Sequence, residues 1–266
     1  MTLKEKLKWD GAIANRLATV ERTQCEIAAG KASKAEHYWY VGETHGYAIE
    51  CYIEGDAQKT KEAAKLVVRA ALEYFYGDWR KTLATPDGTT GHEEWKLFCL
   101  WYEEAMRSLP WACALEDWAA IRRIAEYPPE NKLPKASKAV GETAWGWALI
   151  TFLRDQPRKQ VEQFLVRAET HKAKRPKLLC PVLRALLDNG AAEFKNALMA
   201  YLAYFRKSEF KRDLDKLLAL DGTILYHLGQ KRGFNIQLPE NVADHIIRFD
   251  RRLTLAKTLE QASFSS

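Results

Sequence analysis

Paired carboxylates are the residues of this sequence whose types fit the chemistry of a hydrolase. They stand at Glu93-Glu94, Glu103-Glu104 and Glu116-Asp117, within 25 residues of one another. General acid–base catalysis requires two such groups to converge in a cleft with shifted pKa values. Adjacent acids on a helix are more typical of a solvated face, and acids in a first helical turn complement the helix dipole. We therefore expect no catalytic residues and no enzyme activity.

The histidines and glycines give little support for a metal or nucleophile site. His37 and His45 lie eight residues apart with Glu36 and Glu43 nearby, but no His-Glu-x-x-His motif occurs. No Gly-x-Ser-x-Gly motif and no glycine-rich loop opening a helix occurs either. We expect capped or partly buried histidines, no metal ligands and no cofactor.

The most ordered polar pattern lies in a helix expected at about residues 35–54. Glu36, Glu43 and Glu50 recur every seven residues, Tyr40 and Tyr47 fall between them, and Glu54 extends the line. Helical spacings of three, four and seven return to one face. This face is either an acidic, aromatic surface for a basic partner or an ordinary solvated face. On the opposite side, a core stripe is expected at Tyr38, Val41, Ala48 and Tyr52.

The net charge of +6 is unevenly distributed along the chain. Residues 1–133 carry 18 basic and 21 acidic side chains, whereas residues 134–266 carry 23 basic and 14 acidic ones. The basic residues of the second half are interleaved with acids such as Glu209, Asp213 and Asp215. A nucleic-acid reader needs a continuous positive face, so no nucleic-acid partner is expected.

Helical periodicity dominates the elements that must position these residues. Glycine and proline stops and polar caps divide the chain into segments. Helices are expected at residues 3–29, 35–54, 57–76, 92–109, 116–127, 142–154, 158–171, 177–188, 192–207, 216–231 and from 240 into the 250s. An extended segment is possible at residues 234–238, and residues 84–91 form the clearest loop. Gly190 and Gly233 are expected to end helices.

These segments predict an all-α fold, an irregular array of antiparallel helical hairpins with about 10–11 helices. Turns at Glu54-Gly55-Asp56, Asp155-Gln156-Pro157 and Asp188-Asn189-Gly190 join successive helices. We expect a single domain over residues 1–266, with a possible subdivision in the proline-containing segment 128–140.

The sequence favours a cytoplasmic protein. Its N-terminus has no apolar signal-peptide region, and no apolar stretch is long enough to span a bilayer, so no membrane partner is expected. The five cysteines are widely spaced and lie in apolar helical contexts. Small buried thiols in a reducing compartment explain them.

The order of turns and helices in the C-terminal third resembles a known family. An acidic turn, Asp188-Asn189-Gly190, precedes Phe194 and Ala197-Leu198 on a long helix. It is followed by the runs Leu217–Gly222, Lys231–Phe234 and Leu238-Pro239, and similar elements begin at Gly55-Asp56 and Trp145. Over residues 36–240, this order resembles the bacterial polymorphic-toxin immunity proteins of the immunity protein 49 family. The motifs are structural, so no functional residue is carried over.

The resemblance implies an all-α cytoplasmic protein that binds a cognate toxin delivered by neighbouring bacteria and blocks it without catalysis. Inhibitors of nucleases are usually acidic mimics, so the net positive charge implies one of two things. Either the toxin is not a nuclease, or the acidic first half binds it.

We therefore predict an immunity protein that neutralises a cognate secreted toxin domain by stoichiometric binding, with an oligomeric state that the sequence does not define. The alternative is a helical-hairpin scaffold or adaptor that binds another protein and has no toxin. Carboxylates and tyrosines are expected to form the binding surface: Glu36, Tyr40, Glu43, Tyr47, Glu50, Glu54, Glu93, Glu94, Glu103 and Glu104.

Overall fold

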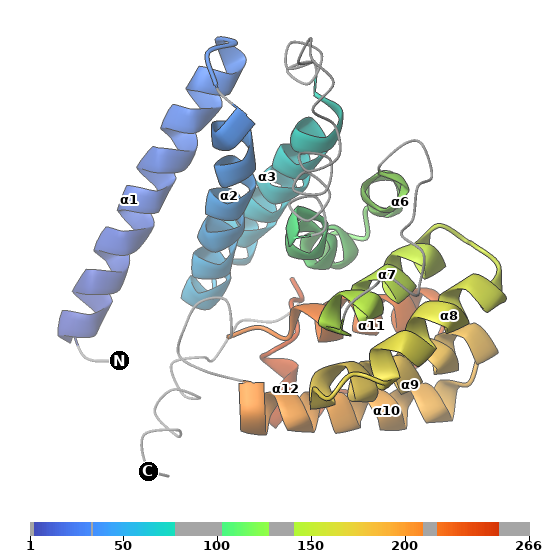
Figure 1. Ribbon diagram of the computed structural model, residues 1–266. Coiled ribbons are helices and arrows are strands. Elements are labelled where there is room, and N and C mark those ends of the chain that lie inside the picture. Colours follow the sequence, from blue (N-terminus) through green and yellow to red (C-terminus); the bar gives the residue numbers. More distant parts are fainter. Residues whose placement is uncertain (1–2, 33, 78–102, 128–140, 210–216, 250–266) are drawn as a thin grey trace, which may run out of the picture. The chain divides into compact units, whose positions relative to one another are not determined.

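The computed structural model describes residues 3–32, 34–77, 103–127, 141–209 and 217–249 (Figure 1). All regular secondary structure in these ranges is helical, which confirms the predicted all-α fold. None of the helices described there combines the length and the apolar character needed to cross a bilayer. The loop expected at 84–91 and the segment 128–140 lie outside the described residues.

The chain groups into two compact units. The first comprises Met1–Trp111 together with Ile247–Ser266, and the second comprises Ala112–Ile246. The chain passes from one unit to the other inside a helical segment at residues 103–114, upstream of the segment where a subdivision was considered.

In the first unit, three consecutive helices lie close to their predicted ranges. They are α1 (Leu3–Ala28), α2 (Lys34–Glu54) and α3 (Ala57–Tyr76), and α2 lies between the other two (Figure 1). Gly30 (φ +66°) and Gly55 (φ +79°) follow α1 and α2 in the left-handed conformation that glycine adopts without strain. Each helix therefore ends where the sequence places its glycine.

The start of α3 and the core stripe of α2 also follow from the sequence. The Asp56 carboxylate accepts a 2.9 Å hydrogen bond from the Lys59 amide and so caps α3. Val41, Ala48 and Tyr52 are buried as predicted, whereas Tyr38, expected in the same stripe, is only half-buried.

The helix stop expected before Pro110 is wrong. Residues 103–114 are continuously helical, and Pro110 is buried within them. The Ser108 hydroxyl donates to the backbone carbonyls of Glu104 (2.8 Å) and Ala105 (3.2 Å). A side chain therefore forms hydrogen bonds with carbonyl groups in the turn before the proline. Packing of this helix therefore outweighs the cost of an interior proline.

In the second unit, helices pack as hairpins joined by short turns, among them the pairs α7–α8 and α9–α10. Its labelled helices are α6 (Trp118–Glu126), α7 (Gly141–Leu153), α8 (Arg158–Glu169), α9 (Lys174–Asp188), α10 (Ala191–Tyr204), the π-helix η2 (Phe205–Glu209), α11 (Leu220–Lys231) and α12 (Glu240–Ala243). Trp145 and Trp147 of α7 are both buried and belong to the core of this unit.

Several helix ends in this unit differ from prediction: α9 begins at Lys174 instead of 177, and α11 begins at Leu220 instead of 216. Asn189 (φ +56°), not Gly190, takes the left-handed position after α9, and Gly190 instead precedes α10 as its N-cap. The last helix ends at Ala243 instead of continuing into the 250s. His245 then turns inward: its Nδ1 lies 3.1 Å from the Leu217 carbonyl, and its own carbonyl accepts from the Ala219 amide at 2.8 Å.

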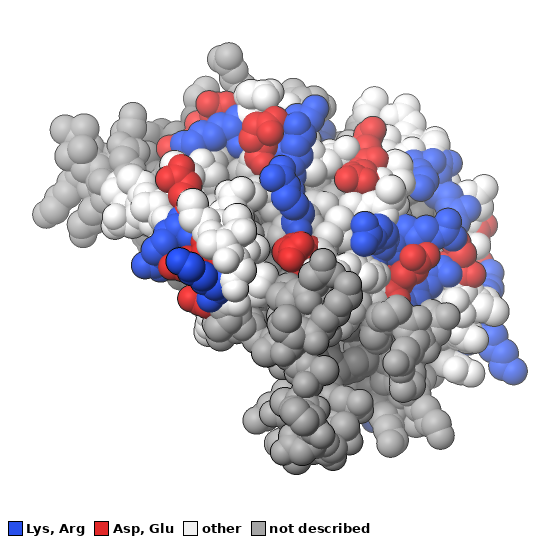
Figure 2. All heavy atoms as spheres, turned by 90° about the horizontal axis from the view of Figure 1, so that it is seen from above, with Lys and Arg blue, Asp and Glu red and all other residues white. Residues whose placement is uncertain are grey.

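Many arginines of the second unit are paired with acids on neighbouring helices, so its positive charge is locally compensated. The pairs include Arg184 with Glu162 and Glu169, Arg158 with Asp188, and Arg175 with Asp221. On the face seen in Figure 2, blue and red side chains are correspondingly intermixed. These three arginines thus form ion pairs that join helices.

Three of the cysteines, Cys51, Cys113 and Cys180, are buried free thiols, and burial raises the pKa of each. Cys25 is exposed on α1, contrary to the expectation that every thiol is buried. The fifth, Cys99, lies outside the described residues.

Candidate functional site

The structure places much of the stripe expected on α2 in the interior. Tyr40, Tyr47 and Glu50 are only 6%, 8% and 1% exposed. Because α2 lies between α1 and α3, neighbouring helices cover a side that the spacing alone suggested was solvated. The expected exposure of these three side chains is therefore wrong.

Arg16 of α1 explains how the buried carboxylate of Glu50 is accommodated inside this unit. Its guanidinium donates to Glu43 at 2.8 Å and to Glu50 at 2.9 Å. Burial raises the pKa of Glu50, while the hydrogen bond and charge of Arg16 lower it. A Cβ atom at position 46 would lie 2.5 Å from Nη1 of Arg16, so Gly46 provides the space for the guanidinium against α2.

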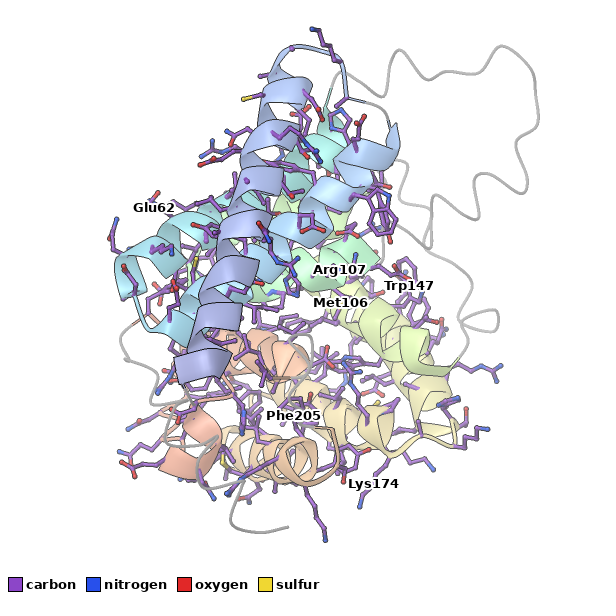
Figure 3. All side chains as sticks on the ribbon, turned by 90° about the vertical axis from the view of Figure 1, so that its left-hand side faces the viewer. Glu62, Met106, Arg107, Trp147, Lys174 and Phe205 are labelled. Carbon is purple, nitrogen blue, oxygen red and sulfur yellow. The ribbon has the colours of Figure 1, made fainter. Side chains whose placement is uncertain are left out.

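A second arginine packs against α2 from the helix at residues 103–114. Arg107, labelled in Figure 3, forms an ion pair with Glu104, whose side chain is fully buried. Burial raises the pKa of Glu104 to about 7, although the charge and hydrogen bond of Arg107 act in the opposite direction. The expectation that Glu104 belongs to a binding surface is therefore wrong. Its neighbour Glu103 is exposed and accepts a 3.1 Å hydrogen bond from the Tyr38 hydroxyl.

His45 has a structural role at the centre of this unit. Its Nδ1 accepts a 2.9 Å hydrogen bond from Trp111 Nε1, and the ring is also hydrogen-bonded to the backbone of Arg107. Burial and the nearby arginines lower the pKa of His45 to about 3, so the ring is neutral at physiological pH. In the part of the chain that the structure describes, no group of three or more His, Cys, Asp or Glu side chains could hold a metal ion.

The outward face of α2 is centred on a residue that the sequence patterns did not single out. Trp39 is 63% exposed, and Glu36 and Glu43 lie one helical turn before and after it. Its ring packs edge-on against Tyr38 at a centroid distance of 5.2 Å, and Tyr38 in turn bonds Glu103. We call Glu36, Trp39, Glu43 and Glu103, with Tyr38 behind them, the Trp39 surface.

One signal in the sequence was available for this surface. Residues 38, 39 and 40 are consecutive aromatics, and successive helical positions are separated by about 100°. Three such side chains cannot all face the same core, so one of them must point outward. The structure places Tyr40 inside, Tyr38 at the boundary and Trp39 outside.

The other expected binding residues are not part of the Trp39 surface. Glu54 ends α2 and pairs with Lys59 of α3 at 2.8 Å. Glu93 and Glu94 lie outside the described residues. The structure thus brings together three of the ten expected residues: Glu36, Glu43 and Glu103.

The paired acids Glu116 and Asp117 form a helix junction. Glu116 adopts the left-handed conformation (φ +56°) after the helix at residues 103–114, and its amide donates to the Cys113 carbonyl at 3.0 Å. The Asp117 carboxylate accepts a 3.0 Å hydrogen bond from the Ala120 amide and caps α6. Local backbone geometry therefore accounts for both side chains.

Comparison with known proteins identifies no relative of this chain: no family model, curated protein or solved structure matches it. The Trp39 surface is therefore interpreted from its own residues. It combines a large exposed indole with carboxylates, and its base is fixed by the hydrogen bonds of Arg16 and Tyr38.

Proposed function

We propose that this protein is an immunity protein that binds and neutralises a cognate toxin domain through the Trp39 surface. The observation that supports the proposal is the 63% exposure of Trp39 among carboxylates. Tryptophan is strongly enriched among the residues that dominate binding free energy at protein interfaces. An aromatic centre bordered by polar side chains is also the usual composition of a protein–protein interface.

The surroundings of Trp39 are suited to binding without rearrangement. Tyr38 is held from two sides, by its hydrogen bond to Glu103 and by the ring of Tyr74 at 6.2 Å. Glu43 is held by Arg16. Side chains that are already ordered lose little conformational entropy on association, which favours tight binding.

The chemistry of the surface also supports a basic partner. Carboxylates surrounding an indole complement a basic surface that contains an apolar hollow. Attraction between the charges accelerates association, and added salt weakens this effect. The toxin domain is therefore expected to present Lys or Arg side chains around the pocket that receives Trp39.

Co-expression with the product of the adjacent reading frame tests the proposal. Immunity predicts that the chain restores growth of cells expressing that product and that the two proteins co-purify in a fixed ratio. Co-purification without toxicity of the adjacent product would favour the adaptor function. Toxicity without rescue or co-purification would contradict the proposal.

A further inference from the structure

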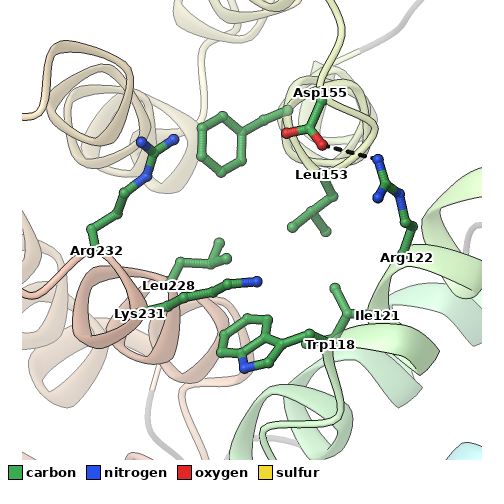
Figure 4. Close-up of a pocket in the computed structure, with 9 residues that line it drawn as sticks. Trp118, Ile121, Arg122, Leu153, Asp155, Leu228, Lys231 and Arg232 are labelled. Atoms are coloured by element: carbon green, nitrogen blue, oxygen red, sulfur yellow. Dashed lines mark hydrogen bonds and ion pairs between the residues drawn. The ribbon is translucent and has the colours of Figure 1, made fainter.

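The second unit contains a pocket of about 420 Å³ that none of the features above explains (Figure 4). Three elements supply its walls: α6, the end of α7 with the turn that follows, and the end of α11. Aromatic rings, aliphatic side chains, one carboxylate and three cations line it, among them Trp118, Arg122, Asp155, Lys231 and Arg232. This volume lies in the usual range for small-molecule sites.

Two of the three cations in the pocket have no carboxylate partner in the described part of the chain. Arg122 is paired with Asp155 at 3.2 Å and with Glu126 at 3.2 Å. Lys231 and Arg232 form no ion pair with any described residue, although both are exposed at the end of α11. The pocket therefore has two cationic groups available to a ligand.

Aromatic rings hold these two cations at the pocket. Lys231 Nζ lies 3.8 Å from the centroid of the Trp118 ring, and Arg232 Cζ lies 5.9 Å from that of Phe152. Figure 4 shows Arg232 and Arg122 on opposite sides of the opening, with the Lys231 side chain extending between them above Trp118. A ring fixes a cation without neutralising it, so the N–H groups directed away from the ring stay available.

Cations at the end of a helix also interact favourably with its dipole, which would by itself explain Lys231 and Arg232 on an open surface. It does not explain why their side chains line a cavity together with Ile121, Leu153 and Leu228. Phe152 and Leu153 are half-buried and supply apolar surface to the wall, whereas Ile121 and Leu228 are buried within it. The same cavity therefore offers two positive charges and an apolar surface.

We propose that this pocket binds a small phosphate monoester attached to a flat ring, of about mononucleotide size. A phosphate monoester carries a charge close to −2 at neutral pH, which matches the two cations that form no ion pair with a described residue. Arginine and lysine are both common phosphate ligands. The ring of the ligand packs against the apolar wall. Because the site lies wholly within the second unit, it is independent of the Trp39 surface.

Isothermal titration calorimetry of the full chain with AMP tests the proposal, with adenosine and inorganic phosphate as partial ligands. AMP is expected to bind at least about tenfold more tightly than either, because only AMP engages both the cations and the apolar wall. AMP binding no tighter than that of adenosine or phosphate, or not detectable at millimolar concentration, would overturn the proposal.

Charge variants locate the binding. The double variant Lys231→Gln/Arg232→Gln should lose at least about tenfold in AMP affinity. The matched control Lys159→Gln/Lys195→Gln removes the same charge from exposed positions on α8 and α10 and should bind as the parent does. Equal affinities of the two double variants, each folded by circular dichroism, would contradict the assignment.

One substitution should strengthen binding. Asp155→Asn removes the single acidic side chain of the lining and releases Arg122 from one of its two partners. Asp155 has φ +52°, and asparagine tolerates this conformation equally well, so the backbone is preserved. The variant should bind AMP several-fold more tightly. Unchanged or weaker binding would show that the negative charge of Asp155 does not oppose phosphate binding in the pocket.

Discussion

The guanidinium of Arg16 donates a 2.9 Å hydrogen bond to the carboxylate of Glu50 across the interface between α1 and α2. Glu50 is 1% exposed, so this contact supplies a counter-charge to an acid inside the unit. The space that the guanidinium occupies exists because residue 46 has no side chain. This electrostatic contact between α1 and α2 therefore depends on a glycine.

This dependence predicts opposite effects for two glycines of the same helix. Gly42→Ala should raise the free energy of unfolding by up to about 1 kcal/mol, because alanine favours a helix and its Cβ would lie 3.7 Å from Arg107. Gly46→Ala should lower it by about 2 kcal/mol or more, because the new Cβ displaces Arg16 and leaves Glu50 buried without its cation. Urea unfolding measures both values.

A double-mutant cycle isolates the cause. An Arg16→Ala background lacks the guanidinium that Gly46→Ala would displace. In that background, Gly46→Ala should therefore no longer lower the free energy of unfolding, and only the stabilising helix preference of alanine should remain. A penalty that persists in that background would show that the space at Gly46 serves something other than Arg16.

Glu104 should make stability depend on pH. Burial raises its pKa in the folded state to about 7, above the value near 4.5 for an unfolded chain. Between these values the folded state holds a proton that the unfolded state has released, so this group lowers stability as pH rises and has no further effect above pH 7. Glu104→Gln removes the effect.

The free energy of unfolding of Glu104→Gln relative to the parent should therefore rise by about 3 kcal/mol between pH 4.5 and pH 7 and then stay constant. Urea titrations at several pH values measure this difference. His45 acts in the opposite sense, since its lowered pKa reduces stability as pH falls below 6.5, but it is common to both proteins and cancels. A difference that does not change with pH would refute the raised pKa.

Substitutions of Glu116 and Asp117 should change the stability of the protein in opposite directions, although each removes one negative charge. Glu116→Gly should stabilise the protein by about 0.5–1 kcal/mol, because glycine adopts φ +56° without the strain of a side chain. Asp117→Ala should destabilise it by about 1 kcal/mol through loss of the α6 cap. Thermal unfolding compares the two, and shifts in the same direction would contradict this interpretation of the junction.

The helices of this protein could be predicted from local signals, and most of their ends too. α3 spans its predicted range because an aspartate cap and two glycines define it, and Asp188-Asn189-Gly190 marks the turn between α9 and α10. Two predictions were wrong: the helix at residues 103–114 continues through the buried Pro110, and α12 ends at Ala243, after which His245 reaches the Leu217 carbonyl. Side-chain hydrogen bonds of Ser108 and His245 occur at those two places.

The Trp39 surface was harder to predict than the helices, for a physical reason. Spacings of three, four and seven place Glu36, Glu43 and Glu50 on one side of α2, but spacing does not reveal whether water or another helix covers that side. The answer depends on Arg16, which lies 34 residues before Glu50. Only the aromatic run at residues 38–40 indicated locally that one large side chain had to face outward.

If the Trp39 surface binds a basic partner, removing its charges should slow association. Glu36→Gln/Glu103→Gln should lower the association rate constant for the toxin domain several-fold at low salt and reduce its dependence on ionic strength. Glu21→Gln/Glu62→Gln, which changes exposed acids of α1 and α3, is the control. Stopped-flow or surface-binding kinetics measure both, and equal rates for the two variants would rule out steering by this surface.

Trp39 is proposed to anchor the partner. The dissociation constants of two matched variants for the toxin domain measure the contribution of Trp39 to the affinity. Trp39 and Val166 are both exposed hydrophobic residues on helices, at 63% and 54%, so replacing either by alanine should preserve the fold. Trp39→Ala should weaken binding at least about tenfold, whereas Val166→Ala should leave the affinity unchanged. Equal affinities of the two variants for the toxin domain would contradict it.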